Sequence, residues 1–177
     1  FVADGADVLT EGRYIYEGVW WQMDASNHYF HMALEGSPSS PGNFASIYGV
    51  YLDDIDGGPL GSAIDYVPAT FDGIDIILDA HFADDGVTQP DTDMRLDAAH
   101  LHLWNSTLHD YEETDLTAGQ YRIVFDGAGT GTLDWVVSKA RFADDGFRVC
   151  GSTHTNVGIS FDTTECRMTP EPTSMAL

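Results

Sequence analysis

Residues Ile74–Phe82, with the sequence IDIILDAHF, show the pattern that indicates the fold class of this chain. Branched aliphatic and aromatic side chains dominate it, as they do in β-strands, and it runs into an Asp-Asp-Gly turn. Similar runs recur along the chain with turn residues between them, whereas the periodicity of an amphipathic helix is almost nowhere found. The predicted strands are Arg13–Glu17, Val19–Asp24, His28–Glu35, Ala45–Asp53, Ile74–Phe82, His100–Trp104, Gln120–Phe125, Leu133–Phe142, Phe147–Cys150 and Val157–Phe161.

About ten strands in a chain of 177 residues predict an all-β domain, a two-sheet β-sandwich that is jelly-roll-like. We expect this single domain to span residues 1–166, with residues 1–11 as an extended arm. The polar segment Asp110–Gly119 is expected to be a loop or a short helix.

The sequence contains one internal repeat of two similar segments. The segment Asp79–Gly86 (DAHFADDG) resembles Lys139–Gly146 (KARFADDG), sixty positions later. Each copy ends an apolar run and enters an Asp-Asp-Gly turn. Two copies are too few for a solenoid, so we expect them to be equivalent strands in the two halves of the sandwich.

The composition is strongly acidic, with 29 Asp and Glu against 7 Lys and Arg and a formal net charge of -22. This charge repels the phosphates of nucleic acid and the surface of anionic membranes, so neither is an expected partner. Dense negative charge is tolerated best in salt or beside divalent cations. The composition therefore favours a saline or calcium-containing medium, or simply a well-solvated acidic surface.

The Asp-rich turns are candidates for calcium binding, above all Asp84, Asp85, Asp144 and Asp145. Calcium prefers carboxylate and carbonyl oxygens, which such loops supply. The spacing of an EF-hand is absent, and Asp and Gly are also ordinary turn residues. The sequence leaves both interpretations open.

His100 and His102 are candidates for a transition-metal site, because alternate residues of a strand face the same side. The His-x-His pair resembles that of the cupins, which bind metal on such a strand. The resemblance implies a nearby glutamate, but here Glu112 follows ten residues later and the second cupin motif is missing. Trp104 shares the same face, so an aromatic and histidine patch on the sheet is an equal alternative.

The aromatic residues of the N-terminal part are candidates for binding sugar. Trp20, Trp21, Tyr14 and Tyr16 could form a stacking platform, as in jelly-roll carbohydrate-binding modules. Because neighbours in a strand point to opposite faces, one tryptophan is expected in the core and the other on the surface. His28 and His31 should likewise face opposite sides.

The two cysteines, Cys150 and Cys166, are expected to form one disulfide that closes a loop of about 15 residues. Motifs for nucleophilic catalysis and phosphate binding are absent from the sequence. We therefore expect a protein that is not an enzyme.

The C-terminal segment, residues 167–177, is rich in proline and contains Pro170, Glu171 and Pro172 followed by small residues and the start of an apolar run. It resembles the head of a PEP-CTERM sorting signal, which sends bacterial proteins to the cell surface or an extracellular matrix. The apolar helix and basic end of that signal are not in the sequence. The resemblance implies an extracellular or cell-surface protein in bacteria, with no membrane segment in the mature form. The start at Phe1 and the stop at Leu177, just inside an apolar run, lead us to expect trimmed ends.

Together these features predict a secreted structural protein, a homo-oligomeric subunit of an extracellular fibre or biofilm matrix assembled by exchange of strands or termini. The first alternative is a carbohydrate-binding module that binds a matrix polysaccharide. The second is a metal-dependent jelly-roll enzyme built on the His-x-His pair.

Overall fold

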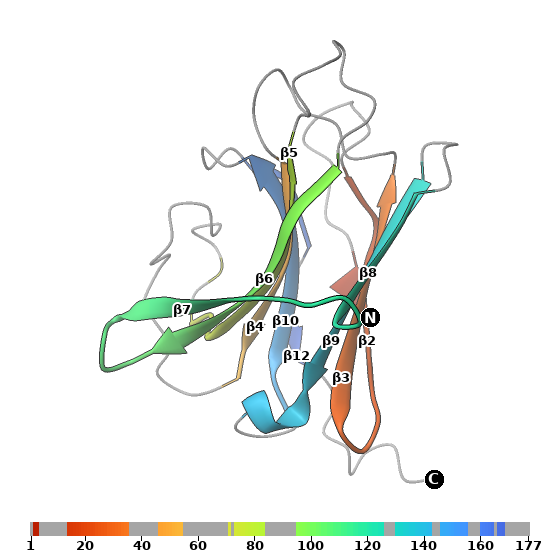
Figure 1. The fold of residues 1–177 in the computed structure, drawn as a ribbon. Coiled ribbons are helices and arrows are strands. Elements are labelled where there is room, and N and C mark those ends of the chain that lie inside the picture. Colours follow the sequence, from red (N-terminus) through yellow and green to blue (C-terminus); the bar gives the residue numbers. More distant parts are fainter. Residues whose placement is uncertain are drawn as a thin grey trace, which may run out of the picture.

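The chain folds as two antiparallel sheets packed face to face, in a computed structural model that describes twelve strands (Figure 1). The described residues are 2–3, 14–35, 46–54, 71, 73–83, 95–125, 130–142, 146–155, 160–164 and 166–168. The first sheet has the order β1 (Val2–Ala3), β2 (Tyr14–Met23), β3 (Asn27–Glu35), β9 (Thr130–Ser138) and β8 (Tyr121–Phe125). The second has the order β11 (Ser160–Thr163), β10 (Arg148–Thr155), β4 (Ser46–Asp53), β5 (Ile76–Ala83), β6 (Arg95–Asn105) and β7 (Asp110–Asp115), with β12 (Arg167–Met168) also paired to β10.

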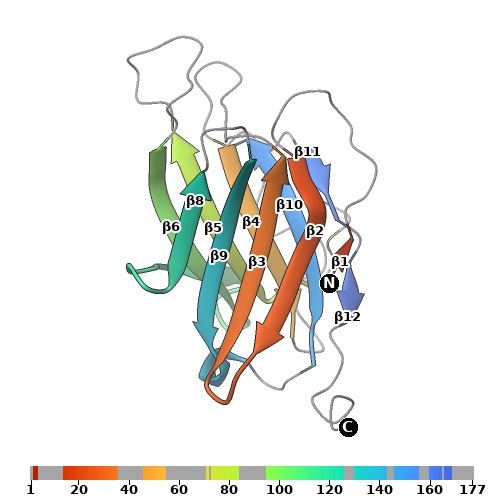
Figure 2. The same cartoon turned by 90° about the vertical axis from the view of Figure 1, so that its right-hand side faces the viewer.

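The prediction of an all-β sandwich is confirmed. Strands β3 and β9, paired in the first sheet, lead into β4 and β10, which are paired in the second sheet. This crossing of a strand pair from sheet to sheet is jelly-roll-like, whereas β4 to β7 follow one another as a simple meander. Figure 2 shows the first sheet in front of the second.

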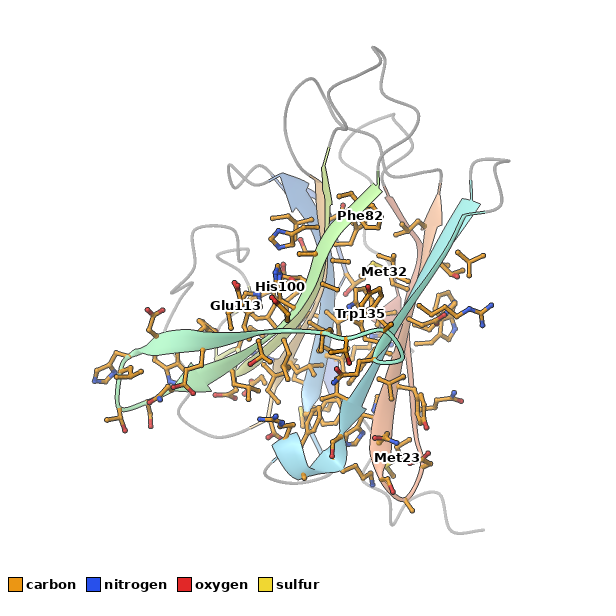
Figure 3. The ribbon with its side chains drawn as sticks, in the orientation of Figure 1. Met23, Met32, Phe82, His100, Glu113 and Trp135 are labelled. Atoms are coloured by element: carbon orange, nitrogen blue, oxygen red, sulfur yellow. A yellow bond between two sulfur atoms is a disulfide. The ribbon has the colours of Figure 1, made fainter. Side chains whose placement is uncertain are left out.

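Alternating side chains of the two inner faces form the main core, in which Trp135 is the largest fully buried side chain. Met32, Phe82 and Trp135, all members of this core, lie between the two sheets in Figure 3. The outward neighbours along β3 and β9 are polar or only partly buried. Burial of one face is the reason why these strands alternate in sequence.

A second, smaller apolar cluster lies around Tyr51 and Ile77, whose neighbours along the strand point into the main core. Phe71, Ile74 and Cys150 complete it. Both faces of the central strands β4 and β5 are therefore buried over part of their length. This explains why Ile76–Leu78 is an unbroken apolar run rather than an alternating one.

The predicted strands Arg13–Glu17 and Val19–Asp24 are one strand, β2, with an irregularity where the pairing register to β3 shifts between Ile15 and Val19. Gly18 lies in this irregularity with a φ of 129°, a backbone conformation that side chains with a Cβ rarely adopt. The glycine thus bends a strand that the sequence pattern divided in two.

Two further expectations are wrong. Asp110–Gly119 is not a loop or helix: its first six residues form β7, which pairs with β6 in a hairpin that bends away from the sandwich (Figure 1). The strand predicted to end at Phe142 ends at Ser138, where the Ser138 side chain caps a 3₁₀ turn, Lys139–Arg141. The repeated segments Asp79–Gly86 and Lys139–Gly146 are therefore not equivalent strands, because the first begins inside β5 and the second begins with this turn.

The disulfide between Cys150 and Cys166 is confirmed, with the two Cα atoms 4.4 Å apart. It links β10 to the residue before β12. In the chain-entropy account, closing a loop of this size stabilises the fold by about 3 kcal/mol. A structural disulfide indicates folding in an oxidising, non-cytoplasmic compartment. Within the residues that the structure describes, no helix has the length and hydropathy of a transmembrane segment.

Candidate functional site

Four side chains lie in a row across the outer face of the first sheet. Trp20 of β2 is opposite His31 of β3, which is opposite Asp134 of β9, which is opposite Arg122 of β8. Every second side chain of a strand points to the outer face. The observed register places one such side chain of each strand opposite one of the next strand, which produces the row. An aromatic ring, an imidazole, a carboxylate and a guanidinium are therefore presented together.

The centre of this row is a close polar pair. His31 Nδ1 lies 2.6 Å from Asp134 Oδ1, and the two side chains are 41% and 32% exposed. The Trp20 ring stands edge-on to the His31 ring, with centroids 5.3 Å apart. Both members of the pair thus remain accessible while their neighbours restrict their orientation.

A half-open groove of about 700 Å³ lies over the row. Besides the four side chains of the row, Tyr29 lines it, and Tyr121, which packs against the core, also borders it. Ligand pockets usually measure some 300–1,000 Å³ and combine aromatic walls with a few polar groups. The groove has both the size and the lining of a small-molecule or oligosaccharide site.

The hairpin between β2 and β3 fixes Tyr29 at one side of the groove. Asp24 accepts hydrogen bonds from the Tyr29 hydroxyl at 2.6 Å and from the backbone N–H groups of Ser26 and Asn27. The Tyr29 bond, supported by the backbone bonds, lowers the pKa of Asp24 from its usual value. The same bond raises the pKa of Tyr29, so the phenol keeps its proton.

The two adjacent tryptophans face opposite sides, as predicted. Trp21 packs against the core, edge-on to Phe147, and its indole N–H donates to Nδ1 of His28 at 3.1 Å. His28 is fully buried there, whereas His31 is on the outer face. Both residues line the groove, but the Trp21 ring packs against the core, so the ring that faces the candidate sugar platform is that of Trp20.

A second polar site lies on the outer face of the other sheet, around the fully buried Asp79 of β5. Asp79 Oδ1 is 3.0 Å from His100 Nδ1, and Asp79 Oδ2 is 2.9 Å from His102 Nε2 and 3.1 Å from His81 Nε2. His100 and His102 share one face of β6, as predicted, and are both buried. The structure thus adds a carboxylate to the His-x-His pair.

Hydrogen bonds from the surrounding histidines determine the ionisation state of Asp79 in this cluster. Burial raises the pKa of Asp79, but the bonds from His100, His102 and His81 outweigh it and hold this pKa well below the usual value. The bond to Asp79 in turn raises the pKa of His100 against the opposing effect of burial. The buried carboxylate is therefore ionised and compensated by imidazole donors.

Strand β7 completes the cluster with Glu113 and Asp115, which lie opposite His102 and His100. Both carboxylates are exposed. Glu112 points to the other face and hydrogen bonds Asn105, so it is not the missing partner of the histidines. Trp104 continues the same face and packs edge-on against Tyr111, with ring centroids 5.2 Å apart.

Several predicted residues lie outside the described part of the structure: Asp84, Asp85, Asp144, Asp145, Pro170, Glu171 and Pro172. The calcium turns and the sorting motif therefore stay predictions. Tyr14 and Tyr16 belong to β2, but their side chains are likewise not described.

Sequence reasoning missed the other members of both sites. Asp134, Arg122 and Asp79 become neighbours of His31 and His100 only through the register of distant strands. The sequence shows which residues of one strand share a face. It does not show which strands pair, or in which register.

No protein-family model, curated protein or solved structure matches the chain. The function must therefore be inferred from the chemistry of its two outer faces.

Proposed function

We propose that the protein is a secreted carbohydrate-binding β-sandwich whose groove on the first sheet holds a neutral polysaccharide of the extracellular matrix. The single observation that carries this proposal is the row Trp20, His31, Asp134 and Arg122 beneath the groove. The disulfide and the Pro-Glu-Pro segment support a location outside the cell.

The chemistry of the row suits a sugar ring. A pyranose has an apolar C–H face and a rim of hydroxyl groups that both donate and accept hydrogen bonds. Trp20 and Tyr29 supply aromatic surface, while Asp134 accepts, Arg122 donates and His31 can do either. Because these groups belong to neighbouring strands, they present a surface that crosses the sheet and suits an extended chain.

The net charge narrows the class of sugar. A formal charge of -22 repels uronic acids and sulfated polymers over the whole surface. Arg122 is one of only seven cationic side chains in the sequence and lies beside a carboxylate, so the groove is not a basic patch. Neutral glucans, xylans or similar polymers are therefore the expected ligands.

The test is a glycan array, followed by binding measurements with the best neutral oligosaccharide. Removing a central aromatic anchor costs at least about 1.4 kcal/mol, or a tenfold loss of affinity, so Trp20→Ala should weaken binding at least tenfold. Trp104→Ala removes a partly buried tryptophan from the other sheet and serves as the matched control. Equal loss in both variants, or binding only to acidic glycans, would contradict the proposal.

The fibre-subunit interpretation stays a prediction. In the part of the chain that the structure describes, the N-terminal strand β1 pairs with β2 of the same chain, Val2 with Val19 and Ala3 with Gly18. Exchange of this strand between subunits would require that short pairing to open. Electron microscopy of the native material over a range of salt and calcium would detect filaments.

A further inference from the structure

The second site orients two imidazole rings in a way that bears on metal binding. Asp79 lies 3.0 Å from His100 Nδ1 and 2.9 Å from His102 Nε2, both ordinary hydrogen-bond lengths. An ionised carboxylate only accepts, so each ring directs an N–H toward Asp79. The other nitrogen of each ring, Nε2 of His100 and Nδ1 of His102, then faces strand β7.

The distances from these two nitrogen atoms to the carboxylates of β7 are longer than those from the other two ring nitrogens to Asp79. His100 Nε2 lies 3.7 Å from Asp115 Oδ1 and 3.9 Å from Glu113 Oε1, and His102 Nδ1 lies 3.7 Å from Glu113 Oε2. These separations exceed hydrogen-bond length. Two ligands of one tetrahedral ion, each bonded at about 2.0–2.1 Å, stand about 3.4 Å apart. A small inward movement of exposed carboxylates would therefore bring these atoms to the spacing of metal ligands.

We propose that His100, Glu113 and Asp115 bind a divalent transition-metal ion of the zinc class, with Asp79 as the residue that positions the imidazole. One ligand atom from each of these three residues lies within 4.8 Å of the others. Mixed imidazole and carboxylate ligands favour zinc and its neighbours, whereas calcium and magnesium prefer oxygen alone. The site is separate from the groove, which lies on the other sheet.

The role of Asp79 follows a general arrangement of metal centres. A histidine that binds metal usually donates its other N–H to a carboxylate, which fixes the tautomer and the ring orientation. Asp79 is fully buried and can hold His100 in this way, whereas Glu113 and Asp115 are 57% and 90% exposed. Figure 3 shows His100 and Glu113 on the side of the sheet away from the core residues Met32 and Trp135.

Exposure of the two carboxylates has a consequence for the ion. It can enter directly from solvent, and with three protein ligands it keeps at least one coordination position for water. The site therefore has the composition of an open centre rather than of a closed structural one.

The experiment is titration of the metal-free protein with Zn²⁺ at 0.15 M salt in the presence of excess Ca²⁺, followed by calorimetry. Excess calcium occupies sites that attract any divalent cation to this acidic surface. We expect one zinc equivalent to bind. Co²⁺ in place of zinc should give the visible absorption of a site with imidazole and carboxylate ligands.

Variants of the exposed ligands keep the test independent of folding. Glu113→Gln and Asp115→Asn should each weaken zinc binding about tenfold or more, and Asp79→Asn should weaken it about 10–100-fold. Glu112→Gln is the matched control, because it removes the same charge from the opposite face of the same strand. His31→Gln removes an imidazole from the other sheet. Neither control should change the zinc affinity.

Three results would overturn the proposal. One is the absence of zinc binding above the level that calcium displaces. Another is equal loss in Glu112→Gln and Glu113→Gln, which would show general charge attraction. The third is unchanged zinc affinity in both Glu113→Gln and Asp115→Asn.

Discussion

The two outer faces of the sandwich use the same chemical pair, histidine with aspartate, in opposite environments. On the first sheet, His31 and Asp134 are 41% and 32% exposed and lie in a groove. On the second sheet, the His100 and Asp79 side chains are 10% and 0% exposed. The second apolar cluster continues this face, since Ile77, one of its members, is opposite His102. Burial, rather than residue type, separates a half-exposed pair that lines a groove from a buried pair in which Asp79 holds the imidazole in place.

The largest expected effect tests which tryptophan belongs to which face. Trp21→Ala removes a ring packed against Phe147 and His28 and should lower the free energy of unfolding by about 3 kcal/mol or more. Trp20→Ala, on the groove face, should lower it by about 1 kcal/mol or less. Urea unfolding of both variants checks this, and comparable losses would show that the two rings are not on opposite faces.

The next effect compares the two carboxylates directly. Asp79→Asn should lower the free energy of unfolding by about 2–3 kcal/mol, because it removes a buried carboxylate that accepts hydrogen bonds from three imidazole rings. Asp134→Asn disrupts a half-exposed pair and should change it by about 0–1 kcal/mol. Both variants are measured in a chelator, so that bound metal does not contribute. Equal destabilisation by the two substitutions would contradict the distinction between the buried His100–Asp79 pair and the half-exposed His31–Asp134 pair.

The smallest effect concerns an exposed carboxylate with three hydrogen bonds, Asp24. Its pKa is lowered, chiefly by the Tyr29 hydroxyl, so its contribution to stability is present above the unfolded pKa near 3.8 and is lost as the pH falls through the folded value. NMR titration should show that Tyr29→Phe raises the pKa of Asp24 toward 3.8. An unchanged pKa would mean that the backbone bonds from Ser26 and Asn27 alone cause the shift.

The strands were largely predictable because burial selects branched and aromatic residues, as in Ile74–Phe82. Strand β7 was not, because five of its six residues are exposed and it carries no apolar alternation. Its hairpin depends instead on a turn in which Asn105 Oδ1 accepts from the N–H groups of Thr107 and Leu108. Pairing with β6, rather than a pattern of its own, makes this segment a strand.

The sites were predictable only in part. Parity along β6 placed His100 and His102 on one face, and parity along β2 separated Trp20 from Trp21. Asp79 is the residue that sequence reasoning could not assign, because its contact with His100 depends on how β5 pairs with β6. Register is a property of the assembled sheet, so no local pattern reveals it.

We propose above that the groove of the first sheet binds a neutral polysaccharide. Its most direct test is the ¹⁵N–¹H spectrum of the four tryptophan indoles during titration with a neutral oligosaccharide chosen from the array. We predict that the Trp20 indole signal shifts progressively and that the Trp104 signal stays in place. A shift of Trp104 without Trp20, or no shift of any indole at saturating sugar, would contradict the claim.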